Sequence, residues 1–354
     1  MSRHSKTLAL AAVLGAVVST PVLAADAAAP SIDVTGFVDT YYTYNFNDPQ
    51  NKLNGLHVYN PDHNALSLAL AELAFEKKPT TDSRAGFRVD FNFGPAAELT
   101  NIFDPSKDAT PSLGLLEQGY VSFLAGDKIQ VDFGKFVTPI GNELVESKDN
   151  WNYTRSIQFG WAIPFYHAGA RATFTASDKF TLAAYLVNGW NNVVDNNNDK
   201  TFIAQAILKP SSKFTLIGNA IVGKEVEDTR TLIDGVVILN LSDKLALASE
   251  VDFGTEGDAS WSAFSAYAKL TAGSLAFTLR GEMMNDEDGW ATIGTNVSSG
   301  TLTTEFKLGG GVITKLDLRT DMADDPIFMK DNGSLTDSQT SVTLGLVYAF
   351  GGKI

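Results

Sequence analysis

The sequence contains no cysteine, and histidine is scarce, with four residues in 354. Without cysteine no disulfide can form, so the folded chain has to be held together by burial and backbone pairing. Basic residues are also few: 27 lysines and arginines face 41 aspartates and glutamates, giving a formal net charge of −14. Because nucleic acids bind through basic patches that neutralise phosphates, we expect no nucleic-acid partner.

Long apolar runs are missing beyond the first two dozen residues, and a transmembrane helix needs about 20 apolar residues. The start of the chain has the pattern of a signal peptide: Arg3 and Lys6 precede a short apolar stretch at 8–18, and residues 22–24 supply a cleavage point. We therefore predict that residues 1–24 are removed on export and that residues 25–354 form a single domain. The alternative is that the first segment stays as a membrane anchor.

Helical periodicity is almost absent, and an alternation of apolar and polar residues takes its place. Arg88 and Asp90, for example, alternate with Phe87, Val89 and Phe91. The polar face of this segment carries charges of both signs. The same scheme returns in three later segments, at residues 128–133, 275–283 and 311–320. Strands of a membrane barrel alternate in this way, and their hydropathy averages to neutral.

Read with a period of two, the chain divides into strand-like segments separated by turns. Short turns alternate with longer links, among them 224–229 and 254–260. In hydrocarbon every backbone polar group must be paired, so a membrane sheet has to close. We predict an all-β fold: a transmembrane antiparallel up-and-down barrel of about 16 strands (14–18), with short periplasmic turns, long extracellular loops and an aqueous lumen. The predicted strands lie roughly at 31–46, 65–78, 84–94, 115–125, 128–137, 167–176, 179–190, 200–210, 213–223, 229–242, 244–255, 259–272, 274–285, 300–308, 310–322 and 338–350.

One segment breaks the alternation. In residues 65–78, Leu68 and Leu70 share a parity with Glu72, which would place a glutamate toward lipid. A charged side chain on the lipid face is costly. We therefore expect a β-bulge near Ala71, which reverses the parity.

The last segment is amphipathic and ends in aromatic residues. Leu344, Leu346, Tyr348 and Phe350 lie on one face of the expected strand. This pattern resembles the C-terminal signal by which outer-membrane proteins are recognised for barrel insertion, in which the aromatic residue is usually the last. Here residues 351–354 follow it. We predict that Tyr348 and Phe350 form the insertion signal.

Several long motifs resemble one family. They are GFVDTYYTYNFN (36–47), LALAELAFEKKP (68–79), GFRVDFNFGP (86–95), DFGKFVTPIGNELVESKDNWNYTRSIQFGWAIPFYHAGAR (132–171) and YLVNGWNNVVDNN (185–197). In this order they are similar to the putative β-barrel porin-2 family of Gram-negative outer membranes. The resemblance covers nearly the whole chain after the signal peptide and is strongest over its first half. It implies an outer-membrane barrel that acts as a porin.

The longest connection between predicted strands, about 138–166, is the candidate site. It is rich in aromatic residues, and loops of this length in a tight fold are usually functional or disordered. We predict that it narrows the pore, with its acids set across from basic residues of the wall; rings of charge select ions in pores. The alternative is that the loop packs outside as a lid or subunit contact, while the wall charges pair with each other. The predicted constriction residues are Glu143, Glu146, Lys148, Asp149 and Arg155. The predicted wall residues are Arg84, Arg88, Asp90, Asp132, Lys135, Arg171, Arg280, Glu282, Lys315, Asp317 and Arg319.

Signals for catalysis, a cofactor or a metal are weak, and we predict none of them. A hydrolase would need a serine with a histidine base and an orienting partner. Only His167, Ser156 and Asn152 offer such a set, and no nucleophile motif surrounds them. His57 and His63 lack the further spaced ligands of a metal site. Acidic runs in the loops read as solvated faces, with divalent-cation binding as the alternative, and the aromatic residues read as interfacial girdles, with a sugar-stacking path as the alternative.

The predicted function is therefore passive diffusion of small hydrophilic solutes or ions through an outer-membrane porin. A substrate-specific channel is the main alternative, followed by a membrane-embedded hydrolase and a plugged structural or adhesion barrel. The expected partners are outer-membrane lipid, lipopolysaccharide, the barrel-insertion machinery and the transported solutes. A homotrimer is one option for assembly.

Overall fold

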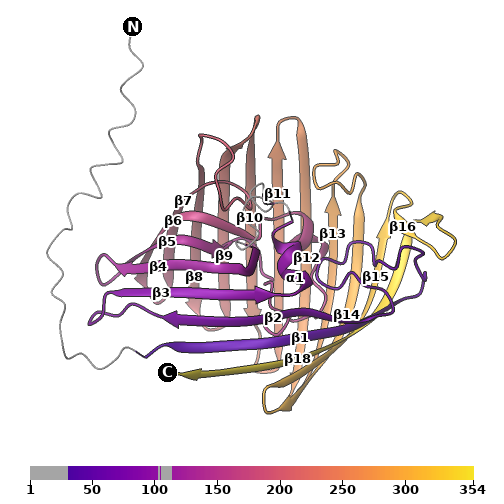
Figure 1. Cartoon of the computed structure of the whole chain (residues 1–354), viewed down its shortest axis with the longest axis horizontal. Coiled ribbons are helices and arrows are strands. Elements are labelled where there is room, and N and C mark those ends of the chain that lie inside the picture. Colours follow the sequence, from indigo (N-terminus) through magenta and orange to yellow (C-terminus); the bar gives the residue numbers. More distant parts are fainter. Residues whose placement is uncertain (1–30, 103, 105–113) are drawn as a thin grey trace, which may run out of the picture. The chain divides into compact units, whose positions relative to one another are not determined.

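The computed structural model describes residues 31–102, 104 and 114–354 (Figure 1). The predicted signal peptide, residues 1–24, lies outside this part of the chain. Within it, sixteen antiparallel strands pair with their sequence neighbours, and β1 pairs with β18 to close a barrel. The prediction of an up-and-down barrel of about 16 strands is confirmed. No helix in the described ranges is long and apolar enough to span a membrane.

The barrel strands have the following bounds: β1 Asp33–Asn45, β2 Leu66–Lys77, β3 Ala85–Phe93, β4 Leu116–Leu124, β5 Ile129–Val137, β6 Tyr166–Ser177, β7 Phe180–Val187, β8 Thr201–Ser211, β9 Phe214–Glu225, β10 Asp228–Asn240, β11 Leu245–Glu256, β12 Ala259–Ala272, β13 Leu275–Asn285, β14 Val297–Gly309, β15 Val312–Ala323 and β18 Ser338–Lys353. The short strands β16 (Phe328–Met329) and β17 (Leu335–Thr336) pair only with each other. In the described ranges, two short helices, α1 (Pro95–Thr100) and α2 (Ile157–Trp161), lie in connections. The alternating sequence pattern does not predict them.

Side-chain alternation explains why these segments form a membrane barrel. Along β13 every second residue is buried: Leu279 is 59% exposed, whereas its neighbour Arg280 is 0% exposed. Phe277 and Met283 share the outer face with Leu279, and Glu282 shares the inner face with Arg280. Successive residues of a strand point to opposite faces, so a period of two separates an apolar outer surface from a charged interior.

The two ends of the barrel differ in the length of their connections. The short connections are 78–84, 125–128, 178–179, 212–213, 241–244, 273–274 and 310–311, and the long ones at the other end are 46–65, 94–115, 138–165, 188–200, 286–296 and 324–337. Two expected long links are wrong, because β9 with β10 and β11 with β12 continue to pair up to the two-residue turns 226–227 and 257–258. Gly257 in the second turn has φ 58°, a conformation that glycine adopts without strain.

Two bulges set which side chains enter the lumen. Asp39 pairs with Leu70 and Thr40 with Leu68, so Ala69 is an extra residue in β2. This bulge lies two residues before the predicted position and turns Glu72 inward. A second bulge leaves Glu117 as the extra residue of β4, between the partners of Asp90 and Phe91.

The ladder of β1 and β18 joins the two ends of the barrel sheet (Figure 1). Gly36 lies opposite Phe350, and a Cβ atom on Gly36 would lie 2.5 Å from the phenyl ring. Because Gly36 has no Cβ atom, the ring of Phe350 on β18 can pack directly against the backbone of β1. Tyr348 and Phe350 both have exposed side chains on the outer face.

Candidate functional site

The connection between β5 and β6, residues 138–165, crosses the interior of the barrel; we call it the inner loop. In the closed order of strands, β13 lies diametrically opposite β5. Arg280 of β13 nevertheless donates to Glu143 of the inner loop at 2.9 Å. A loop that leaves β5 and binds β13 has to pass through the space between them.

Glu143 is held on both carboxylate oxygens. Its Oε1 accepts hydrogen bonds from Arg280 and from Tyr267 Oη at 3.1 Å, and its Oε2 accepts one from the Ser156 amide at 2.6 Å. Arg280 also binds Glu282 at 3.0 Å and the Thr154 carbonyl at 2.6 Å. A buried charge is tolerated when it is paired and hydrogen-bonded, so this network fixes the loop to the far wall.

Side chains of strand β15 bind mainly backbone groups of the inner loop. Asp317 accepts hydrogen bonds from the amides of Tyr153 and Thr154, at 3.1 and 2.8 Å. Lys315 donates to the carbonyl oxygens of Ser147, at 2.7 Å, and Asn150. Arg319 donates to the Arg155 carbonyl at 2.9 Å and pairs with Asp321 at 2.7 Å. These charged wall residues therefore bind backbone groups of the inner loop rather than its charged side chains.

Tyr153 anchors the middle of the inner loop. Its hydroxyl donates to Asp39 of β1 at 2.8 Å. A Cβ atom on Gly345 of β18 would lie 2.1 Å from the Tyr153 ring, so the ring rests directly on the wall backbone. Burial, together with the charge of Asp39, raises the pKa of Tyr153 well above its usual range. The tyrosine therefore stays a neutral hydrogen-bond donor.

The short helix α2 connects the loop to β11 and β13. Ser156 caps it by accepting a hydrogen bond from the Phe159 amide at 2.9 Å. The Ile157 amide donates to Glu282 at 2.6 Å, and Gln158 Nε2 donates to Asp252 at 2.7 Å. Helix amide groups that have no partner within the helix are thus satisfied by a wall carboxylate.

A second loop, 46–65, packs against the first. The guanidinium of Arg155 lies 5.0 Å from the centre of the Tyr59 ring and donates to the Tyr153 carbonyl at 2.7 Å. His57 Nε2 lies 3.5 Å from Asp321. Burial and the charge of Arg319 lower the pKa of His57, which favours its neutral form. Two loops therefore share the interior.

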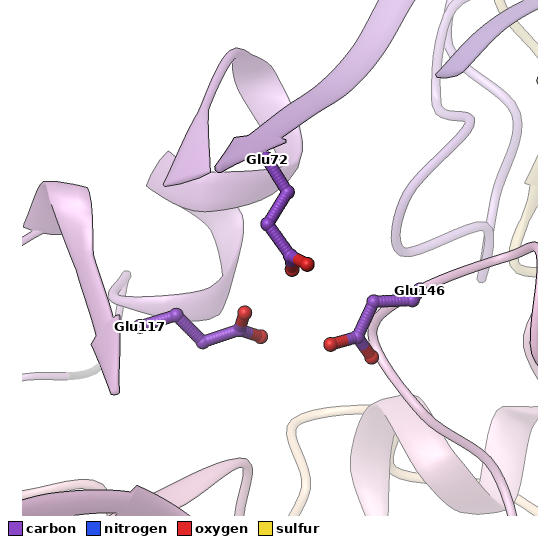
Figure 2. Close-up of side chains that lie close together, drawn as sticks. All are labelled: Glu72, Glu117 and Glu146. Carbon is purple, nitrogen blue, oxygen red and sulfur yellow. The ribbon is translucent and has the colours of Figure 1, made fainter. Parts of the chain in front are cut away.

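Glu146, Lys148 and Asp149 are arranged differently from the prediction. Lys148 and Asp149 pair with each other within the loop rather than with the wall. Glu146 lies beside two acids of the wall, Glu72 and Glu117, instead of a basic residue (Figure 2). Of the three loop acids, Glu143 is thus the one with a direct contact to a predicted basic wall residue.

The remaining predicted wall charges pair with other residues of the barrel. Arg88 binds Asp90 at 2.8 Å, and Arg171 binds Asp132 at 2.7 Å. Lys135 donates to the Leu116 carbonyl at 2.7 Å and to Asn101 at 3.0 Å. Arg84 lies before β3 begins and donates to the Leu124 carbonyl at 2.9 Å, near a short turn. Pairing of wall charges with one another, which was the alternative to the predicted constriction, thus occurs in part of the set.

The three histidines in the described ranges are engaged in local contacts. His167 Nε2 lies 3.1 Å from Thr138 Oγ1, and its Nδ1 lies 3.0 Å from the Gly189 carbonyl. The Ser156 hydroxyl is bound to α2. His63 lies 3.0 Å from Asp48. The serine and histidine considered for a hydrolase are thus each bound to other partners.

A cavity of about 610 Å³ opens between the long loops and the ends of strands β9 to β11. Its lining includes Trp190, Trp290, Arg230 and Glu256. Arg230 binds Glu256 at 2.7 Å, and its guanidinium lies 4.9 Å from the centre of the Trp190 ring. Aromatic faces with a few fixed polar groups are typical of small-molecule sites.

Several residues of the site were not predicted from the sequence, notably Asp39, Glu72, Glu117 and Glu250. Glu250 accepts a hydrogen bond from the Asn142 amide of the inner loop at 2.9 Å. Each is an acid within a predicted strand, on its polar face or next to a bulge, and that position is the signal that could have found them. The predicted wall set contained four other acids, Asp90, Asp132, Glu282 and Asp317, but not these.

A closed membrane barrel with a charged interior, crossed by a loop from its own wall, defines a porin. The chain belongs to the putative beta-barrel porin-2, OmpL-like family, whose family model matches residues 31–350. It is a porin of the Gram-negative outer membrane, as the motifs in the sequence imply. No curated protein matches the chain.

Solved porin structures share the fold at low sequence identity. The outer membrane channel DcaP of Acinetobacter baumannii is 13% identical, with a TM-score of 0.61, and the match covers 92% of this chain and 99% of that one. An anion-selective porin from Comamonas acidovorans is 14% identical, with a TM-score of 0.60 over 90% and 100% of the chains. OmpF of Salmonella typhi is 12% identical, with a TM-score of 0.60 over 90% and 97%.

Proposed function

We propose that this porin passes small hydrophilic solutes or ions by passive diffusion and that the inner loop forms its constriction. The observation that supports this most is the contact of Glu143 with Arg280, which carries the loop across the lumen to the opposite wall. A barrel of this size encloses water rather than a packed core. A loop fixed inside it by charged residues sets both the width and the charge of the path.

The same geometry favours a channel over an enzyme. Nucleophilic catalysis by a serine requires a histidine within hydrogen-bond reach of its hydroxyl. The ring nitrogens of His167 face Thr138 and Gly189, and Ser156 serves as a helix cap. We infer that these residues have structural roles.

The partners follow from the surface. The outer face carries exposed apolar side chains along the strands, which suits outer-membrane lipid. The long loops then face the lipopolysaccharide side and the short turns face the periplasm. We further propose that the barrel-insertion machinery recognises Tyr348 and Phe350, that residues 1–24 are cleaved on export, and that a homotrimer is one assembly to test.

Single-channel recording in planar bilayers tests the constriction. Removing residues 142–154 deletes Glu143 and Tyr153 together with their contacts to Arg280 and Asp39. We expect a severalfold higher conductance than that of the wild type. The matched control removes residues 330–334, the tip of the β16–β17 hairpin at the same end of the barrel. An unchanged conductance on deletion of 142–154 would contradict the constriction.

The same preparations separate the other candidates. A correctly folded wild-type barrel without conductance would indicate a plugged structural protein, and hydrolysis of the bilayer lipid would indicate an enzyme. The cavity lined by Trp190 and Trp290 favours a substrate-specific channel as the second candidate. Blockade of the current by neutral sugars, lost in Trp290→Ala, would support that second reading.

A further inference from the structure

Three carboxylates from separate parts of the chain converge inside the barrel. Glu72 comes from β2, Glu117 from β4 and Glu146 from the inner loop. One oxygen of each lies within 4.8 Å of the others, and the three groups are buried. Figure 2 shows the side chains pointing toward one another.

Glu117 gives an independent sign that this cluster takes a ligand. The residue is only 4% exposed, and neither of its carboxylate oxygens accepts a hydrogen bond from a donor group in the described part of the chain. The bulge in β4 makes it the extra residue, so Glu117 and the adjacent Gln118 are both buried. Bulges often re-aim a side chain next to a functional site.

Two more oxygens beside Glu117 lack partners. Among the residues that the structure describes, no donor bonds Glu72 Oε2 or Oδ1 of the buried Asn92. Asn92 lies directly opposite Glu72 in the ladder of β2 and β3, so their side chains are neighbours on one face. Buried charges are normally paired or bound to a metal, and four unpartnered oxygens in one place call for a shared positive charge.

The type of ligand atom indicates which kind of ion would bind. The donor set consists of oxygens alone, which suits a hard cation and disfavours the softer zinc and copper. A buried set of protein oxygens suits Ca²⁺, which takes about six to eight oxygen ligands in flexible geometry, whereas Mg²⁺ demands a near-ideal octahedron and usually keeps several waters.

We propose that Glu72, Glu117 and Glu146 bind one Ca²⁺, with the Asn92 amide oxygen as a further ligand, and that this ion fastens the inner loop to strands β2 and β4. Arg280 holds Glu143 on the opposite side of the barrel, so the ion gives the loop a second anchor. The proposal concerns binding and stands whether or not solutes pass through the barrel.

A second acidic trio provides a comparison within the same chain. Asp234, Glu250 and Asp252 also approach within 4.8 Å. There each carboxylate accepts a hydrogen bond, from Asn219, from the Asn142 amide and from Gln158, respectively. One oxygen of each of these carboxylates also lacks a partner among the described residues, but each accepts a hydrogen bond through its other oxygen, whereas Glu117 accepts none. We therefore assign the ion to the first trio.

Calorimetric titration of the detergent-solubilised barrel with CaCl₂, after chelator treatment, tests the site. We expect one Ca²⁺ per chain and at least tenfold weaker binding in both Glu117→Gln and Glu146→Gln. Glu76→Gln is the matched control, because Glu76 lies four residues from Glu72 on the same strand and outside the trio. It should bind Ca²⁺ as the wild type does. A gel shift on heating confirms that each variant retains its barrel.

Several outcomes would overturn the assignment. One is the absence of Ca²⁺ binding by a folded wild-type barrel, and another is wild-type affinity in Glu117→Gln or Glu146→Gln. Binding abolished by Glu250→Gln and retained in Glu117→Gln would move the ion to the second trio. Equally tight binding of Mg²⁺ would reject the selection for a larger ion. Because Glu146 lies in a loop, its variant remains informative even if Glu117→Gln fails to fold.

Discussion

At the scale of single residues, buried ion pairs organise the interior of the barrel. Arg280 is fully buried and contacts Glu143, Glu282 and the Thr154 carbonyl. Arg280 and Glu143 were predicted from the sequence as wall and loop residues. Their contact could not be predicted, because the two residues are 137 positions apart in the chain and the contact depends on the path of the inner loop.

Replacing Arg280 tests how strongly this pair holds the barrel. Arg280→Met leaves Glu143 and Glu282 buried without their cation, so we expect a loss of about 3–5 kcal/mol in unfolding free energy. Denaturant titration in detergent, followed by tryptophan fluorescence, measures it. Lys353→Met is the control: its pair with Asp33 is exposed on both sides, with side chains 68% and 42% exposed, and exposed pairs contribute about 0–1 kcal/mol. Equal losses in the two variants would contradict the role given to Arg280.

At the scale of elements, the sequence identified the inner loop as the candidate site. It did not predict the structure of the loop or its contacts. The length and aromatic content of the loop marked it as folded and functional. The helix α2 and the anchoring of Tyr153 on Gly345 were not predicted. A five-residue helix is too short to show a periodic pattern, and a tyrosine carries no sign of which wall it will meet.

Thiol labelling tests the position of this element in the path. The chain has no native cysteine, so a single introduced thiol is labelled alone. The Asp149 side chain is 49% exposed on the inner loop. We expect a bulky thiol reagent to reduce the single-channel conductance of Asp149→Cys. Asp331→Cys, exposed in the β16–β17 hairpin, is the control and should conduct equally before and after labelling. Equal conductance in labelled Asp149→Cys would place the loop away from the narrowest point.

At the scale of the whole molecule, closure of the sheet decides whether a barrel exists. Strand β18 pairs with β1 on one side and with β15 on the other. In lipid an unpaired strand edge leaves backbone groups unsatisfied, so an open sheet is not stable there. The last strand in the sequence is therefore the element that completes the membrane fold.

Truncation before Ser338 tests this dependence. It removes β18 and exposes the edges of β1 and β15, so we expect no heat-modifiable, protease-resistant barrel after refolding into detergent. Deleting Ile354 alone is the control, because the ladder from Asp33↔Lys353 to Asn45↔Ser341 remains. A stable barrel formed by the truncated chain would show that β1 and β15 can close without β18.

The sequence by itself determined the class of fold, because a period of two over most of the chain, with charges on one face, admits few structures in a membrane. It also indicated the bulge in β2, since Glu72 could not share the lipid face with Leu68. Only the tertiary structure decided which loop charges meet which wall charges. Glu143 met a basic residue and Glu146 met two acids, although both lie in the same predicted constriction. Alternation fixes the face on which a side chain lies, whereas the course of a loop across the lumen depends on contacts between residues far apart in the chain.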